Sequence, residues 1–309
     1  GSKGLIGTVS PINSVVGSSA GDEIGAFGAV ALANGNYVVR SPYWDNGGSQ
    51  DAGASTFGDG TTGLTGTVSH SNSLVGTSAF DRFGWYVSEL TNGNYVVSSS
   101  FWDSNTNTDV GASVWCNGLT GRVGAVTSAN ALTGSSNGDG IIALASLSNG
   151  NYVIGSRYWD NGLLVDAGLV SVVDGLKETA GVVSLSNSLV GGLAGDLVGS
   201  VGVTALQNGS FVLPSPQLDD GVIADVGAVA WFPGNPGVSA LISSSNSMVG
   251  TTAGDFLGAY RSNAYGQDVF VFESRAWDNN GLENAGAVTI ARGTQPLLGS
   301  ISLENSVVG

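Results

Sequence analysis

The sequence predicts an all-β fold, a five-bladed β-propeller with about 58 residues and four antiparallel strands per blade. The first observation is a repeat: the segment Asn72-Ser-Leu-Val-Gly76 recurs at a steady interval, beginning at Asn13, Asn72, Asn130, Asn187, Asn246 and Asn305. The second is that each interval holds short apolar runs bounded by Asn-Gly and other glycine turns, which is typical of strands. The third is that no segment combines a helical apolar period with caps, so we expect almost no helix.

The second unit shows how the strands are assigned. Residues 83–90 and 94–100 are apolar runs joined by Thr91-Asn-Gly93, which predicts a hairpin with a type I′ turn. Residues 110–115 alternate in polarity and predict a third strand, and residues 119–126 predict a fourth. The other units follow the same order, so four strands per unit match the size of a propeller blade.

The repeats run from end to end, which predicts one repeat domain over residues 1–309. Its units span about 13–71, 72–129, 130–186, 187–245 and 246–304, and residues 1–12 and 299–309 hold partial copies of the fourth strand. Six copies of that strand meet five sets of the others, so one terminal copy should close the ring. The alternatives are an open β-solenoid, whose coils are usually shorter, or a fragment of a larger propeller.

Composition limits the classes of partner. The net charge is −15 with nine Lys and Arg residues, which argues against binding to nucleic acid or an anionic membrane. Cys116 and His70 are each the sole residue of their type, so neither a disulfide nor a Cys/His zinc site is expected. No apolar run is long enough for a membrane span. Abundant Gly, Asn, Ser and Thr with few Lys favours an extracellular or cell-surface bacterial protein, and we expect this chain to be part of a longer surface polypeptide.

A family resemblance rests on four segments. Phe83-Gly84, the Asn-Gly turn, Val38-Val-Arg-Ser-Pro42 and Gly286-Ala-Val-Thr-Ile290 together resemble the FG-GAP blade of integrin-α-type propellers. The pattern is still more similar to bacterial adhesin-type surface repeats that carry Asn-Gly-Asn-Tyr-Val-Val-x-Ser-Pro-x-Trp-Asp-Asn-Gly. The resemblance implies a propeller and an adhesive role. The chain departs from integrins in having five units rather than seven, and in lacking carboxylates in turns such as Leu32-Ala-Asn-Gly-Asn36.

Aspartates recur at fixed places in the units. Two columns follow the second strand and give candidate calcium ligands, since carboxylates six residues apart around a glycine turn can gather oxygen atoms. These candidates are Asp45, Asp51, Asp103, Asp109, Asp160, Asp166, Asp219, Asp225 and Asp278. The competing interpretation is that they cap turns by accepting backbone N–H groups. We favour turn capping, because Asn284 replaces the acid in the fifth unit.

Aromatic residues precede the first of these aspartates. Trp44, Trp102, Trp159 and Trp277 form one column, in which Leu218 takes the fourth place. A tryptophan there could stack on a sugar ring or pack between blades, and we favour packing because leucine replaces it once. The preceding residues Tyr43, Phe101 and Tyr158 are the candidates for ligand contact.

Catalytic motifs are missing from the sequence. There is no nucleophile elbow, no phosphate-binding loop and no histidine available for a triad. Carboxylates that recur identically in each unit cannot hold the different protonation states that a glycosidase requires. The sequence therefore predicts a non-catalytic adhesion module that recognises a glycan or a protein through its blade loops. The alternatives are a ligand-free structural spacer and, more remotely, a carboxylate-based glycosidase.

Overall fold

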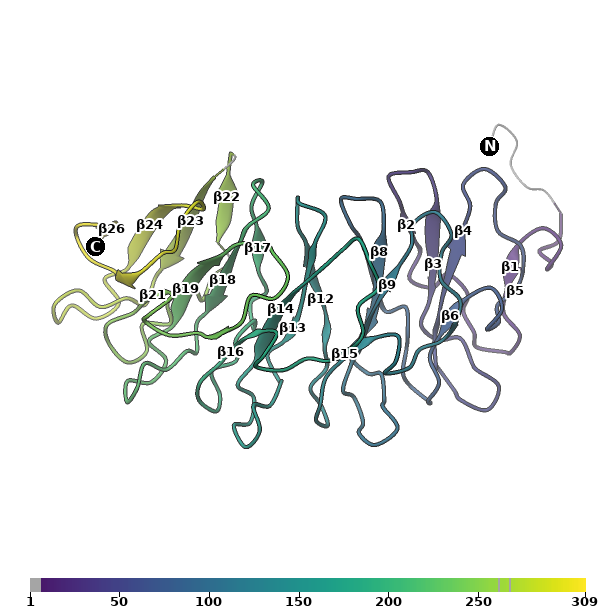
Figure 1. Ribbon diagram of the computed structural model, residues 1–309, viewed down its shortest axis with the longest axis horizontal. Helices are drawn as coiled ribbons and strands as arrows, with labels where there is room; N and C mark the ends of the chain where they lie inside the picture. Colours follow the sequence, from purple (N-terminus) through teal and green to yellow (C-terminus); the bar gives the residue numbers. More distant parts are fainter. Residues whose placement is uncertain (1–6, 261, 267) are drawn as a thin grey trace.

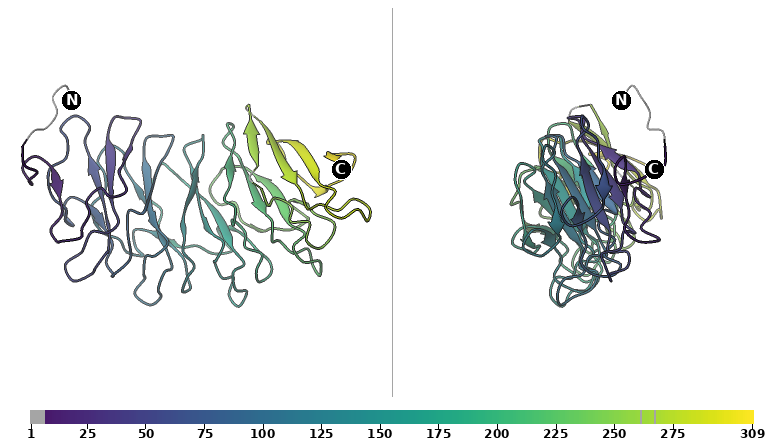
Figure 2. Two further views of the ribbon diagram at one scale, coloured as in Figure 1. Left: turned by 180° about the vertical axis from the view of Figure 1, so that it is seen from behind. Right: turned by 90° about the vertical axis from the view of Figure 1, so that its right-hand side faces the viewer.

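The computed structural model describes residues 7–260, 262–266 and 268–309, and all of its regular structure is β-strand. Within these residues there is no helix, as predicted, and hence no helix that could cross a membrane. The sheets follow one another along the longest axis of the molecule, and Val15–Val16 and Ser306–Val308 lie at opposite ends of that axis (Figure 1). Viewed along the axis, the successive sheets overlap (Figure 2).

One sheet illustrates the pattern. Strands β7 (Tyr86–Glu89), β8 (Tyr95–Ser99) and β9 (Ala112–Cys116) form an antiparallel meander. Strand β11 (Leu132–Thr133) then pairs antiparallel with β9 and lies inside the next copy of the repeated motif. Strand β15 (Gly181–Val182), from the end of the same unit as β11, pairs in parallel with β11. Each complete sheet is thus built from two successive units.

The remaining strands repeat this order. The first complete sheet contains β2 (Ala29–Ala31), β3 (Tyr37–Ser41), β4 (Ala54–Gly58), β6 (Leu74–Val75) and β10 (Gly124–Ala125). The third contains β12 (Ile142–Ser146), β13 (Tyr152–Ser156), β14 (Leu169–Val173), β16 (Leu189–Val190) and β20 (Ala240–Leu241). The fourth contains β17 (Thr204–Ala205), β18 (Phe211–Ser215), β19 (Ala228–Phe232), β21 (Met248–Val249) and β25 (Gly299–Ser300).

Both ends of the array carry incomplete sheets. At the N-terminal end, β1 (Val15–Val16) pairs only with β5 (Gly66–Thr67). At the C-terminal end, β22 (Asn263–Tyr265), β23 (Val269–Ser274), β24 (Ala287–Arg292) and β26 (Ser306–Val308) form a sheet of four strands. The two-stranded sheet therefore corresponds to the last two strands of a complete sheet, and the four-stranded sheet corresponds to its first four strands.

The predicted five-bladed ring is wrong, because the described sheets form an open, solenoid-like array. Each inner motif strand pairs antiparallel with the third strand of the preceding unit, so every unit is joined to its neighbour by the same step along the axis. Neither terminal copy of the fourth strand closes a ring: residues 7–10 form no strand, and Gly299–Ser300 belongs to the fourth sheet. A repeated step without closure leaves two free ends.

The fourth strand also differs from the prediction. Within residues 119–126 only Gly124–Ala125 is a strand, and it pairs in parallel with β6 rather than antiparallel with the third strand of its own unit. The antiparallel place beside that third strand is taken by Leu132–Thr133 of the next motif. Leu132 is buried there, as are its equivalents in the other inner units, so burial of the motif decides the pairing.

The hairpin turn is not of type I′. Gly93 has a positive φ of 85°, but Asn92 does not have a positive φ. The N–H of Gly93 donates to the Leu90 carbonyl, and the N–H of Leu90 donates to the Asn94 carbonyl. This pattern is a type I turn followed by a left-handed glycine, the usual form of a slightly longer hairpin loop. Asn-Gly therefore supplies one positive φ rather than two.

The same turns join neighbouring units. The side-chain amides of Asn92 and Asn94 donate to the carbonyl of Gly175 at 2.8 and 3.0 Å, one unit further along the chain. Asn149 and Asn151 bond Gly234 in the same way. The apolar core is likewise continuous, because its clusters contain side chains from adjacent sheets.

Candidate functional site

A buried aspartate organises the start of each unit. The Oδ2 atom of Asp81 accepts the backbone N–H groups of Thr77 and Ser78 at 2.7 and 2.8 Å. Its Oδ1 atom accepts the N–H of Asp103 at 2.9 Å. The equivalent aspartates are buried in the same contacts, and they are Asp22, Asp139, Asp196 and Asp255. This column holds the loop after the motif against the loop after the second strand.

The candidate calcium ligands lie in those second loops. In each unit the first aspartate accepts the backbone N–H of the residue six positions later, at 2.7–2.9 Å, in the pairs Asp45–Asp51, Asp103–Asp109, Asp160–Asp166, Asp219–Asp225 and Asp278–Asn284. The second residue of every pair has a φ of 51–54°. Asn tolerates this conformation as Asp does, so the turn explains why Asn284 is accepted.

The geometry thus accounts for these aspartates as turn residues. In the described part of the chain, no three His, Cys, Asp or Glu side chains are grouped closely enough to hold a metal ion. Calcium binding stays a prediction, and each loop would have to bind the ion with one aspartate oxygen already accepting an N–H. Two of the second residues, Asp109 and Asp225, have a raised pKa because of partial burial and the nearby Asp103 and Asp219 carboxylates.

Burial also shifts the inner aspartate column. Burial raises the pKa of Asp81 to about 6, against the opposing effect of the three N–H groups that it accepts. The pKa of Asp139 and of Asp196 is raised for the same first reason. These carboxyls contact backbone donors inside the junctions between units, so their titration concerns folding.

The tryptophan column packs in the interior. Trp44, Trp102, Trp159, Trp277 and the equivalent Leu218 are all buried. Their burial agrees with the packing interpretation, because a ring that is covered by neighbouring side chains cannot stack on a ligand. The replacement by leucine occurs at a position where apolar volume is what the fold needs.

The three aromatic candidates for ligand contact separate into two environments. Tyr43 is half-buried and packs with Phe27 and Trp85 at ring-centroid distances of 5.7 and 6.2 Å. Phe101 and Tyr158 are 36% and 47% exposed, and both line one groove. The structure therefore brings together two of the three residues and places the third in an aromatic cluster beside them.

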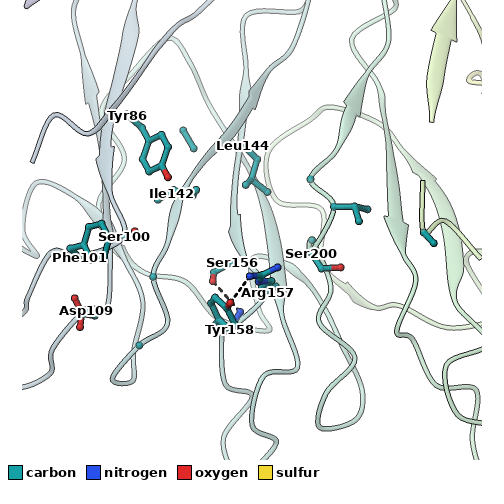
Figure 3. Close-up of a pocket in the computed structure, with 17 residues that line it drawn as sticks. Tyr86, Ser100, Phe101, Asp109, Ile142, Leu144, Ser156, Arg157, Tyr158 and Ser200 are labelled. Atoms are coloured by element: carbon teal, nitrogen blue, oxygen red, sulfur yellow. Dashed lines mark hydrogen bonds between the residues drawn. The ribbon is translucent and has the colours of Figure 1, made fainter. Parts of the chain in front are cut away.

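The groove has a volume of about 810 Å³ and crosses the second to fifth units. Figure 3 shows Phe101, Tyr86 and Tyr158 around it, with Leu144 on β12 and Ser200 in the turn before β17. Tyr86 is 38% exposed, and the sequence analysis did not select it. Its position next to Trp85 at the start of a first strand was the only available signal.

Small residues open this groove. The fourth residue after the buried aspartate is Trp85 in the second unit, where it packs against Phe101 at 5.8 Å. At the same position the next units carry Ala143, Ser200 and Ala259, all of which line the groove. A bulky residue fills the surface in one unit, and its small equivalents leave it hollow in the next three.

Polar groups surround the aromatic rings. The guanidinium of Arg157 lies 4.6 Å from the centroid of the Tyr158 ring, and that of Arg82 lies 5.3 Å from the Phe101 ring. Ser100, Ser156 and Asp109 also line the groove. Stacked guanidinium groups hold the rings in place while leaving part of each ring exposed. The site can offer ring faces, hydroxyl groups, one carboxylate and one cation to a ligand.

Comparison with known proteins gives a family without an assigned activity. A model described as a repeat of unknown function, DUF5650, matches residues 1–26, 31–85, 89–143, 146–200, 205–259 and 265–309. A search of curated proteins found no match. The six matches cover nearly the whole chain and agree with its repeated all-β structure. The chain is therefore a member of the DUF5650 repeat family.

Proposed function

We propose that this chain is a non-catalytic binding module that holds a neutral polysaccharide in the groove that crosses its second to fifth units. The observation that supports this proposal is the presence of Phe101 and Tyr158, from successive units, as partly exposed rings in one groove. Sugar-binding sites commonly combine an exposed ring face with a few polar groups. A groove that crosses several units suits a chain of sugars better than a single one.

Charge favours a neutral ligand. The chain carries a net charge of −15, which repels an anionic polymer over a distance set by the salt concentration. Arg157 contributes one positive charge at the groove, and Asp109 offsets it. Hydroxyl groups of a neutral glycan can bond both of these side chains without a net charge of their own.

The carboxylates support a binding role rather than hydrolysis. Asp109 is the only acidic side chain among the described residues that line the groove. Most glycosidases need two carboxyl groups, about 5–10 Å apart, on either side of the bond that is cleaved. A glycosidase therefore ranks below a binding module. We also propose that the protein is extracellular, at the cell surface, and that it is related to adhesin-type or FG-GAP repeats.

The test is glycan binding by the full chain and by matched variants. On a glycan array followed by calorimetry, the wild-type chain should bind a neutral polysaccharide, and Tyr158→Ala and Phe101→Ala should each weaken it by about 5- to 50-fold, as expected for loss of a stacked ring. Tyr265→Ala is the control, because this exposed tyrosine lies outside the groove. Equal affinity of all four proteins would refute the site.

Two other outcomes distinguish the alternatives. No binding on the glycan array, together with Tyr158-dependent capture of a defined protein, would favour protein recognition through the same groove. No binding in either the array or the protein-capture assay would favour the structural spacer. Release of sugar that depends on Asp109 would instead indicate an enzyme.

A further inference from the structure

Nine asparagines in this chain stand directly before a glycine, and such a pair has a chemistry of its own. A glycine has no side chain to shield its backbone nitrogen, so that nitrogen can reach the side-chain carbonyl carbon of the asparagine before it. Because the nine pairs share this feature, the hydrogen bonds of the fold decide which pair reacts first. The asparagines are Asn34, Asn46, Asn92, Asn117, Asn137, Asn149, Asn161, Asn208 and Asn280.

In six of the nine pairs the N–H of the glycine is already engaged. Gly118 donates its N–H to the side chain of Asn94 at 3.2 Å, and Gly138 donates its N–H to the Thr108 carbonyl at 3.0 Å. A bonded nitrogen has to break its hydrogen bond before it can attack. The other four donate to the carbonyl three residues earlier in a hairpin turn, at 2.9–3.2 Å, and they are Gly35, Gly93, Gly150 and Gly209.

The asparagines of those four hairpin turns are held by their side chains as well. The Oδ1 atom of Asn149 accepts the N–H of Asn151 at 3.1 Å, and its side-chain amide donates to the Gly234 carbonyl at 2.8 Å. The side-chain carbon can approach the glycine nitrogen only after the side chain has left both partners. The same two kinds of bond hold Asn34, Asn92 and Asn208.

The remaining three pairs lie in the aspartate loops after the second strands. Among the described residues, no acceptor is bonded to the N–H of Gly47, Gly162 or Gly281. The side chain of Asn46 is nevertheless fixed, because its amide donates to the Gly76 carbonyl at 2.9 Å and its Oδ1 atom lies 2.8 Å from the His70 ring nitrogen. The amide of Asn280 donates to Oδ1 of Asn279 at 3.2 Å.

Asn161 differs from the other eight asparagines on both counts. Its side chain makes no hydrogen bond within the part of the chain that the structure describes, and the N–H of Gly162 is equally without an acceptor there. Asn161 and Leu164 exchange two backbone hydrogen bonds, at 3.0 and 3.1 Å, around a two-residue loop in which Gly162 has a φ of 66°. Gly162 and Leu163 are exposed, so water reaches this loop.

We propose that Asn161 is a site of self-modification, at which the side-chain amide is lost as ammonia without an enzyme. The Gly162 nitrogen forms a bond to Cγ of Asn161, the Cγ–Nδ2 bond breaks, and the proton of the Gly162 N–H leaves with the ammonia. Water then opens the five-membered ring at either carbonyl, which gives aspartate or isoaspartate. No redox partner is needed, the third unit gains one negative charge, and the inference does not depend on glycan binding.

The fourth unit shows that the aspartate product fits this loop. Asp220 stands at the position of Asn161, and it exchanges two backbone hydrogen bonds with Ile223 at 3.1 and 3.2 Å. Gly221 has a φ of 66°, as Gly162 does. The aspartate form should therefore keep the fold. The isoaspartate form adds one methylene to the main chain of the loop, so it should disturb the two bonds to Leu164.

The chain carries its own reference for the test, because Asn149 has the same following residue in a protected turn. The folded full chain is kept in mildly alkaline water enriched in heavy oxygen, and mass spectrometry of its peptides follows the label at each asparagine. Each hydrogen bond that has to break slows ring closure about five-fold, so Asn161 should convert at least about 20-fold faster than Asn149.

Two controls show whether the fold sets this difference. In urea the chain loses its hydrogen bonds, so Asn161 and Asn149 should convert at nearly equal rates. Asn161→Gln requires a larger ring, so the main acidic species on ion-exchange chromatography should disappear while conversion of Asn149 is unchanged. Equal rates at Asn161 and Asn149 in the folded chain, a difference that persists in urea, or a main acidic species that survives in Asn161→Gln would each overturn the proposal.

Discussion

Adding one methyl group to Gly168, which lies directly against the backbone of the next unit, should uncouple the two halves of the array. In Gly168→Ala the new Cβ would lie 2.2 and 2.4 Å from the backbone nitrogen and oxygen of Val198. No rotation relieves this overlap, because all of these atoms belong to backbone or to Cβ. The loop that carries Val198 must therefore move away from residue 168.

The magnitude follows from the contacts that would be lost. Left-handed φ costs alanine about 1–2 kcal/mol at this position, where φ is 75°. Exposing the buried Val198 side chain removes about 1.5–3 kcal/mol. Losing the bond from its N–H to the Ala167 carbonyl removes about 1 kcal/mol more. The sum is a loss of about 3.5–6 kcal/mol in the free energy of unfolding.

Gly286→Ala is the matched control. Gly286 has nearly the same φ as Gly168, and a Cβ added there would come no closer than 3.4 Å to another atom. It should lose only the left-handed term, about 1–2 kcal/mol. Urea unfolding followed by circular dichroism at submicromolar protein concentration gives both free energies. Gly168→Ala should also separate the unfolding transition into two steps, because repeat arrays unfold in units when an interface between them is weakened. Equal losses in the two variants, with a single transition in each, would refute the reasoning.

Two further predictions concern pH and calcium. The pKa of Asp81 is about 6 in the folded chain and near 4 in the unfolded chain. Between these pH values the folded state binds more protons than the unfolded state. The free energy of unfolding should therefore rise by up to about 3 kcal/mol as the pH falls from 7 to 4. Urea unfolding at stepwise pH checks this, and Asp81→Asn should flatten the slope; an unchanged slope would show that other groups cause it. For calcium, the turn geometry leads us to expect the same melting temperature with and without EDTA, and a clear fall with EDTA would instead establish an ion in the aspartate loops.

Part of the candidate site could be predicted from the sequence. The position before the tryptophan column predicted Phe101 and Tyr158 as contact residues, and both are partly exposed. Tyr43 has the same sequence position, yet it is half-buried, because Phe27 and Trp85 pack around it. Both neighbours lie in the turns that precede β2 and β7, and they bear no sequence relation to Tyr43. The groove itself depends on Ala143 and Ser200, whose small size has meaning only beside the tryptophan at the equivalent place.

The sequence by itself determined the all-β class, the period, the first three strands of each unit and the turns that join them, because these depend on interactions within a few residues. The tertiary structure decided how the motif strands pair and whether the array closes. A two-residue strand such as Leu74–Val75 has too few local contacts to select its neighbour, and it pairs where the next unit buries its side chains. The same step at every junction, with no turn that brings the ends together, makes the array open.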